Sequence, residues 1–180
     1  MASFEAAIEF TLQHEGAYSK HPHDKGGATL FGIASASWPD VYVEVMRLYR
    51  EGKRDEALAR AKEFYRQNFW NARPFSRIES QPVATLAFDM HVNHSMRAAG
   101  RLVQRAANAL SHGQYSALTE DGIVGPKTVR RLNALARRYQ QALIAALCSE
   151  RYAYFKSLTK RDHRQRSFMR GWANRCYPPD

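Results

Sequence analysis

Two carboxylates lie nine residues apart near the start of the chain, in the stretch HEGAYSKHPHDKGGATLFGI from His14 to Ile33. Glycoside cleavage needs a protonated carboxyl group that donates to the leaving oxygen, and usually a second carboxylate that activates water or acts as a nucleophile. Glu15 and Asp24 are candidates for this pair, and Thr29 carries a hydroxyl that could orient a water molecule. The spacing alone is equally typical of a helix end followed by a surface turn.

The surroundings of the two carboxyl groups predict different pKa values. Glu15 lies where a first helix is expected to end, and the negative end of a helix dipole disfavours an ionised carboxylate. Tyr18 and Phe31 would desolvate Glu15 further, which also raises its pKa and suits a general acid. Asp24 belongs to a polar turn and should stay charged. Such a divergence is the usual arrangement of an acid and its partner.

Other residues are candidates for contact with a sugar chain. Glycines in the turn allow the backbone to approach a polysaccharide closely, and aromatic rings can stack on sugar faces. Aromatic residues at helical spacing are more often part of the core, so both interpretations stay open for Trp70. The candidate substrate-binding residues are Tyr18, Gly26, Gly27, Phe31 and Trp70.

Apolar residues recur at helical spacing along most of the chain, which predicts a mainly α protein. The first helix should cover residues 4–15, with Ser3 as its N-cap. Extended segments around Tyr18 and over residues 29–33 then predict one small β-hairpin after the first helix. Residues 83–93 are apolar almost all round, which is typical of a central buried helix. The other helices are expected over residues 41–50, 55–70 and 96–110, from Pro126, and from about 138 to 158.

Several motifs in the same order resemble the N-acetylmuramidases of glycoside hydrolase family 108, a group of phage-type and secretion-associated lysozymes. The stretch from His14 resembles the family signature E-G-G-Y-S…D-x-G-G-x-T-x-x-G-I, and AKEFYRQNFW, FDMHVNHS and DGIVGPKT continue the resemblance over about residues 8 to 175. Ala17 replaces a glycine of this signature, and Ser95 replaces the glycine usual after V-N-x. The resembled V-N-x-G motif makes Asn93 a further candidate for substrate binding, in the cleft wall, and a buried asparagine bonded to the backbone is the other interpretation that stays open.

The resemblance implies a lysozyme-like fold and two regions packed as one compact unit. Residues 1–92 would form the muramidase region with the active-site hairpin, and residues 93–180 a helical peptidoglycan-binding-like region. Glu15 would be the catalytic acid, and Asp24 and Thr29 would match an aspartate and threonine of phage lysozymes, with one residue less between them here.

The expected reaction is hydrolysis of the β-1,4 bond between N-acetylmuramic acid and N-acetylglucosamine, in wall remodelling, lysis or protein release. The expected partner is the glycan strand of peptidoglycan, and no cofactor is required. Three alternatives stay open: a lytic transglycosylase, a non-catalytic wall-binding module, and a helical protein that binds nucleic acid.

The formal net charge of +10 over 180 residues implies attraction to a polyanion. The basic residues are spread over several predicted helices rather than one recognition face, which favours general adhesion to an anionic surface over nucleic-acid binding. No apolar stretch approaches the roughly 18 residues of a membrane span, so no stable membrane insertion is expected. Nothing in the sequence fixes an oligomeric state.

The first apolar segment contains Glu5 and Glu9, which is unlike a secretory signal. We therefore expect synthesis in the cytoplasm and action on periplasmic peptidoglycan after release by another route. Asp89, His91 and His94 form a D-x-H-x-x-H string, but positions 89 and 91 lie about 200° apart on a helix, so no metal site is predicted. Two cysteines, at 148 and 176, are expected to be reduced thiols.

Overall fold

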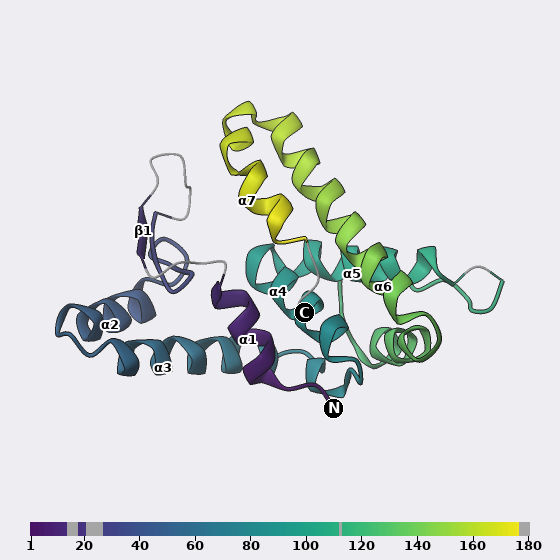
Figure 1. The fold of residues 1–180 in the computed structure, drawn as a ribbon, viewed down its shortest axis with the longest axis horizontal. Helices are drawn as coiled ribbons and strands as arrows, with labels where there is room; N and C mark the ends of the chain where they lie inside the picture. Colours follow the sequence, from purple (N-terminus) through teal and green to yellow (C-terminus); the bar gives the residue numbers. More distant parts are fainter. Residues whose placement is uncertain (14–17, 21–26, 112, 177–180) are drawn as a thin grey trace.

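The computed structural model describes residues 1–13, 18–20, 27–111 and 113–176. Helices make up most of this structure, and a small sheet follows the first helix, as the sequence predicts (Figure 1). The α-helices are α1 (Phe4–Gln13), α2 (Pro39–Arg50), α3 (Arg54–Tyr65), α4 (Gln81–Asn93), α5 (Met96–Ala109), α6 (Pro126–Arg161) and α7 (Met169–Asn174). Short helical turns lie at η1 (Arg66–Trp70), η2 (Phe75–Arg77) and η3 (His163–Phe168).

The sheet has three antiparallel strands, β1 (Tyr18–Lys20), β2 (Ala28–Leu30) and β3 (Ile33–Ala34), in the order β1-β2-β3. The predicted hairpin corresponds to β1 and β2. The predicted extended segment over residues 29–33 is interrupted, because a tight turn at Phe31 and Gly32 starts a third strand. Both turn residues have positive φ, 49° and 77°, which is the conformation of a two-residue hairpin turn.

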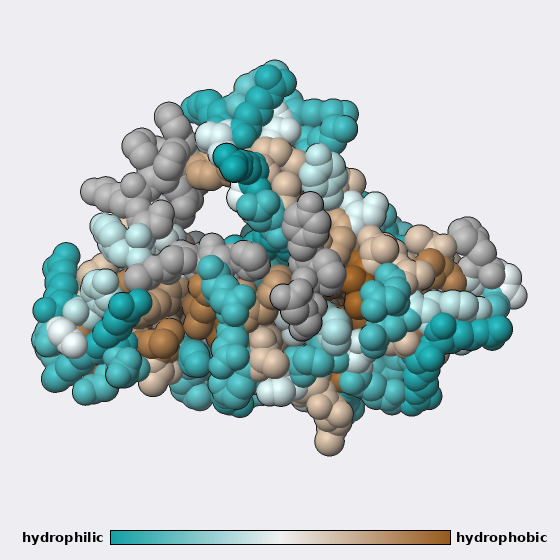
Figure 2. All heavy atoms as spheres, viewed as in Figure 1, coloured by the Kyte–Doolittle hydropathy of each residue, from teal (hydrophilic) through white to brown (hydrophobic). Residues whose placement is uncertain are grey.

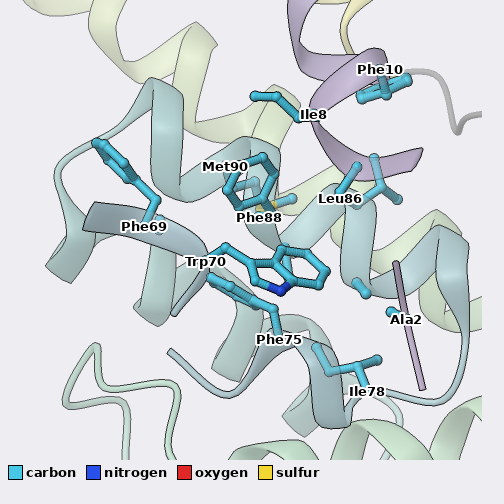
Figure 3. Packing of buried hydrophobic residues seen from close by; sticks show 14 of the residues in the cluster. Ala2, Ile8, Phe10, Phe69, Trp70, Phe75, Ile78, Leu86, Phe88 and Met90 are labelled. Atoms are coloured by element: carbon cyan, nitrogen blue, oxygen red, sulfur yellow. The ribbon is translucent and has the colours of Figure 1, made fainter. Parts of the chain in front are cut away.

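Helix α4 is the central element, as predicted: every residue from Val83 to Met90, and His91 after it, is buried. α1 packs against it on one side, and α5 and α6 also contact it. An aromatic cluster fills the space between α1 and α4 (Figure 3), where the Trp70 ring centroid lies 5.5 Å from that of Phe88 and 5.8 Å from that of Phe4. The first helix is thereby fixed against α4 by aromatic packing.

Helix α6 bends at Tyr139, whose φ of −139° and ψ of 40° are not helical. The bend divides the helix close to residue 138, where the sequence predicts a new helix to begin. The second part of α6 runs back over α4 and forms, with α7, a helical hairpin that projects from the molecule (Figure 1). None of the helices in the described ranges is long and apolar enough to cross a membrane.

The predicted helix over residues 55–70 begins at Arg54 and is α-helical only to Tyr65, after which the chain continues as the π-helical turn η1. This turn adds a residue to the helical repeat and directs Phe69 and Trp70 into the core, where both are buried. The outer faces of α2 and α3 carry polar side chains, seen in teal at the left of Figure 2.

Candidate active site

Glu15, Asp24 and Gly26 lie outside the described residues, and the site is defined by the elements that flank them. α1 ends at Gln13, two residues before Glu15, and Asp24 belongs to the connection between β1 and β2. Thr29 lies in the central strand, opposite Ser19 of β1 and Ala34 of β3. Leu30 is buried against the core, and because side chains alternate along a strand, Thr29 faces the other side of the sheet.

The turn at Phe31 is fixed by contacts to two neighbouring helices. The Tyr65 hydroxyl of α3 donates a hydrogen bond to the Phe31 carbonyl at 3.0 Å. The Phe31 ring is buried and meets Tyr49 of α2 edge to face, with centroids 6.0 Å apart. These contacts hold a backbone conformation that non-glycine residues rarely adopt. Phe31 therefore supports the sheet, although part of it also borders the groove described next.

A groove of about 420 Å³ lies between the last turn of α1, the Phe31 turn and α3. Its α1 wall includes Gln13, the last residue of α1, which lies two residues before Glu15 in the sequence. Its lining contains both negative and positive side chains: the carboxylate of Glu9 on α1, and the basic groups of Arg54 and Lys62 on α3. The lining residues are Glu9, Leu12, Gln13, Phe31, Arg54, Leu58 and Lys62.

Three buried charges join α4 to the C-terminal half of the chain. Asp89 of α4 is fully buried, and its Oδ2 lies 2.6 Å from Nη2 of Arg151, which is fully buried in α6. Arg175 donates to the same carboxylate from Nη2 at 3.1 Å and from Nε at 3.2 Å. Burial alone would raise the pKa of Asp89, but the two guanidinium groups outweigh it and hold this pKa well below its usual value.

This charge cluster reaches the C-terminal end of α1. Nη2 of Arg175 also donates to the carbonyl of Thr11, in the last described turn of α1, at 3.2 Å. Carbonyls near a helix C-terminus often need partners from outside the helix, and Arg175 supplies one to Thr11, which ties this end of α1 to the charge cluster. The sequence analysis missed this cluster, because a carboxylate and two arginines this far apart in sequence give no recognisable spacing.

Asn93 is bonded to the protein in the structure. Its Nδ2 donates to the backbone carbonyl of Asp89 at 2.7 Å and to Oδ1 of Asp89 at 3.1 Å. Of the two interpretations left open by the sequence, the structure favours an asparagine bonded to its own helix. Its role is to orient Asp89.

Trp70 does not lie where a sugar could stack on it. Its ring is 4% exposed and packs among Phe4, Phe75 and Phe88 (Figure 3). The expectation of a substrate contact is wrong for Trp70 because the π-helical turn rotates this ring into the core. Tyr18, by contrast, is 51% exposed on the edge strand and available for contact with a ligand.

Gly27 lies just after the segment that contains Asp24 and has a φ of 76°. A Cβ at this position would lie 2.7 Å from Oγ of Ser35, too close for a real side chain. The glycine therefore lets the end of the hairpin pack tightly against the chain that follows β3. Gly27 therefore contributes to the site by allowing this backbone conformation and not by a side-chain contact.

The histidines of the D-x-H-x-x-H string serve packing in the structure. His91 is buried, with its Nδ1 2.7 Å from the Ala87 carbonyl. The His94 ring lies against Tyr154 and Phe155, with centroids 4.8 and 5.1 Å away. Burial lowers the pKa of His91 to about 4 and that of His94 to about 3. Within the described residues, no group of three His, Cys, Asp or Glu side chains is placed to hold a metal ion.

Comparison with known families agrees with this arrangement in two parts. Residues 8–95, from α1 to the end of α4, match the family model of glycosyl hydrolase 108. These residues form a glycosyl hydrolase 108 domain. Residues 98–177 match a second model, described as a predicted peptidoglycan domain. The chain is therefore a lysozyme-type glycoside hydrolase joined to a peptidoglycan domain, and peptidoglycan is its substrate class.

Among solved structures, the chain is similar to one described as the structure of Brucella abortus SagA. The two share 24% sequence identity and a TM-score of 0.59, over 94% of this chain and 95% of the other. At this level of identity the likeness concerns the fold. No curated protein matches the chain.

Proposed function

We propose that this peptidoglycan hydrolase is an N-acetylmuramidase that cleaves the β-1,4 bond between N-acetylmuramic acid and N-acetylglucosamine. The observation that carries the proposal is the union, in one chain, of a family 108 domain and a peptidoglycan domain. The groove between the end of α1, the Phe31 turn and α3 supports it, because Glu15 follows this end of α1 in the sequence.

In this mechanism Glu15 donates a proton to the glycosidic oxygen as the bond breaks. The C-terminal end of α1 disfavours the charged form of a carboxyl group near it, which keeps an acid protonated near neutral pH. Asp24, in the connection between β1 and β2, either activates a water molecule positioned by Thr29 or stabilises the positive charge that develops on the sugar. Tyr18, Gly26 and Gly27 border the path of the glycan.

The two regions divide the work at the end of α4. Residues 1–92 carry the chemistry, and residues 93–180 hold the peptidoglycan, with the Asp89, Arg151 and Arg175 cluster joining them. The protein acts on periplasmic peptidoglycan in wall remodelling, lysis or protein release, and it needs no cofactor.

The test is mass spectrometry of peptidoglycan digested by the wild type, by Glu15→Gln, by Glu9→Gln and by Glu56→Gln, before and after borohydride reduction. We expect reducible muramic-acid ends from the wild type and a loss of about 10²- to 10⁴-fold with Glu15→Gln, the usual contribution of a general acid. Glu9 is an exposed carboxylate of the groove wall, so Glu9→Gln tests whether this neighbouring group is the acid instead of Glu15. Glu56→Gln removes an exposed carboxylate of α3 that lies outside the groove lining, so it should retain activity and serves as the matched control.

Other outcomes would change the assignment. Anhydro ends that persist in Asp24→Asn would identify a lytic transglycosylase, which uses a single acid. Undiminished cleavage by Glu15→Gln would exclude Glu15 as the acid, and a loss confined to Glu9→Gln would transfer that role to Glu9.

A further inference from the structure

The loop between α5 and α6 has no regular secondary structure in its described part, yet side chains of α5 hold it firmly. Asn108 binds Leu118 in both directions: its Nδ2 donates to the carbonyl at 2.9 Å, and its Oδ1 accepts from the N–H at 2.7 Å. Gln104, which is only 2% exposed, also binds the loop backbone as donor and as acceptor, at Gly122 and Ile123. Its Nε2 donates to the Ile123 carbonyl at 3.1 Å and its Oε1 accepts from the Gly122 N–H at 2.8 Å.

Close packing and an arginine fix the same loop from two sides. A Cβ at Gly100 of α5 would lie 2.0 Å from the carbonyl oxygen of Gly122, so the loop backbone rests directly on the helix. From α6, Arg131 donates to Oγ of Ser111 at 2.7 Å and to the carbonyl of Ser116 at 2.9 Å. An irregular loop held this rigidly loses little conformational freedom when a ligand binds, which is typical of a binding site.

Two adjoining hollows lie between this loop and the first turns of α6, with volumes of about 490 and 520 Å³. Both are lined by Leu118, Lys127 and Arg130, so they form one groove. Apolar and polar residues lie side by side at this end of the molecule, at the right of Figure 2. Hollows of this volume suit an extended ligand rather than a single ion.

The groove offers positive charge beside apolar surface. Lys127 and Arg130 are exposed, and neither forms a hydrogen bond or ion pair with any residue in the described part of the chain. Tyr115 and Ile123 are 42% and 61% exposed, unusual for such large apolar side chains. The acidic lining residue, Asp121, already accepts from Gln104 at 2.7 Å and from the Ile123 N–H at 2.8 Å. The complementary ligand carries carboxylates and short apolar side chains.

We propose that this groove, formed by Tyr115, Leu118, Ile123, Lys127 and Arg130, binds the anionic stem peptide of peptidoglycan. Lys127 and Arg130 bind the carboxylates of the peptide, and the apolar residues contact its alanine methyl groups. The proposal rests on the proposed function, because it takes peptidoglycan as the substrate and assigns the glycan to the groove beside α1. The N-terminal half of the protein then binds the glycan strand of peptidoglycan, and the C-terminal half binds its stem peptide.

The experiment follows backbone amide signals by NMR while a soluble muropeptide, one N-acetylglucosamine–N-acetylmuramic acid disaccharide with its tetrapeptide, is added to the full chain. The probe lacks the bond that a muramidase cleaves, so the wild type can be used. The variants are Lys127→Gln/Arg130→Gln and the control Arg161→Gln/Arg166→Gln, which removes the same charge from exposed positions at the tip of the α6–α7 hairpin. The disaccharide without peptide is titrated in parallel.

We expect the muropeptide to shift the amides of residues 115–130 and to bind at least about tenfold more weakly to Lys127→Gln/Arg130→Gln, the effect of losing one charged hydrogen bond or more. The control should bind as the wild type does. Equal weakening in both variants would overturn the proposal in favour of unspecific charge attraction, and equal binding of the peptide-free disaccharide would overturn it in favour of a glycan site. No change in either variant would also overturn it.

The same preparations are assayed for reducible muramic-acid ends on intact wall. Cleavage without peptide binding at the groove refutes the groove alone. Peptide binding without cleavage refutes the muramidase assignment and leaves the groove in place.

Discussion

At the scale of single residues, Phe31 shows how the sheet beside the candidate acid is held. A φ of 49° is unusual for a bulky residue, and such conformations cost on the order of 1–3 kcal/mol unless the surroundings hold them. Here the Tyr65 hydroxyl binds the Phe31 carbonyl and the Tyr49 ring meets the Phe31 ring. The strain lies in the turn that follows Thr29 and Leu30, where the proposed role of Thr29 would need a fixed backbone.

Replacing Tyr65 by Phe removes only the hydroxyl and leaves the buried Phe31 carbonyl without this donor. We expect Tyr65→Phe to lower the free energy of unfolding by about 1–3 kcal/mol and to reduce peptidoglycan cleavage. Urea denaturation and a cleavage assay measure both effects. Tyr152→Phe, at an exposed position, is the control, and an equal effect of the two substitutions would contradict the role of the hydroxyl.

At the scale of elements, α4 joins the two halves of the chain through one carboxylate. Asp89 is bound by Arg151 from α6 and by Arg175 from the segment after α7, and Arg175 also binds the Thr11 carbonyl of α1. Three segments distant in sequence therefore meet at a single buried charge. Such an ion cluster contributes little net stability against an apolar replacement, but it cannot lose one partner without leaving an uncompensated charge.

We expect Asp89→Asn to lower the free energy of unfolding by about 3–5 kcal/mol, because two buried arginines then lose their counter-ion. Glu79→Gln makes the same carboxylate-to-amide change in the exposed pair with Arg137, and it should produce no measurable loss. Guanidinium denaturation of both variants gives the comparison. A loss no larger for Asp89→Asn than for Glu79→Gln would show that the cluster is not needed to join the halves.

At the scale of the whole molecule, the buried His91 and the partly buried His94 couple stability to pH. The pKa of His91 is lowered to about 4 and that of His94 to about 3, in both cases mainly by burial. The unfolded chain takes up protons at these sites near pH 6.5. Between these folded-state pKa values and about pH 6.5, the two histidines are protonated in the unfolded state but not in the folded state. Stability therefore falls as the pH falls from about 6.5 towards 4.

We therefore expect a loss of a few kcal/mol in the free energy of unfolding between pH 7 and pH 4. Urea midpoints across this range measure it, and the double variant His91→Gln/His94→Gln should show a shallower dependence. His163→Gln, at an exposed position, should leave the slope unchanged. Asp89 does not contribute to this loss, because its pKa is lowered and its stabilising charge disappears only at still lower pH. An unchanged slope in the double variant would contradict the assignment.

The sequence by itself determined the helical class, the central position of residues 83–93, the hairpin after the first helix and the break near residue 138. These features follow from local patterns: apolar periodicity shows which face of a segment is buried, and glycines and prolines show where it ends. The order of several motifs also indicated the family, and the matched model of glycosyl hydrolase 108 bears this out. The roles of Glu15 and Asp24 rest on the same motifs and stay predictions.

Only the tertiary structure decided that Trp70 belongs to the core and that Asp89 serves two arginines. A periodic pattern does not show what a buried face packs against, and the π-helical turn that rotates Trp70 inward interrupts the pattern itself. Asp89 and Arg175 are 86 residues apart in sequence, so no local spacing connects them. Their pairing is fixed by the way α6 and the segment after α7 return over α4, because a charge can be buried only where the fold brings its counter-charge.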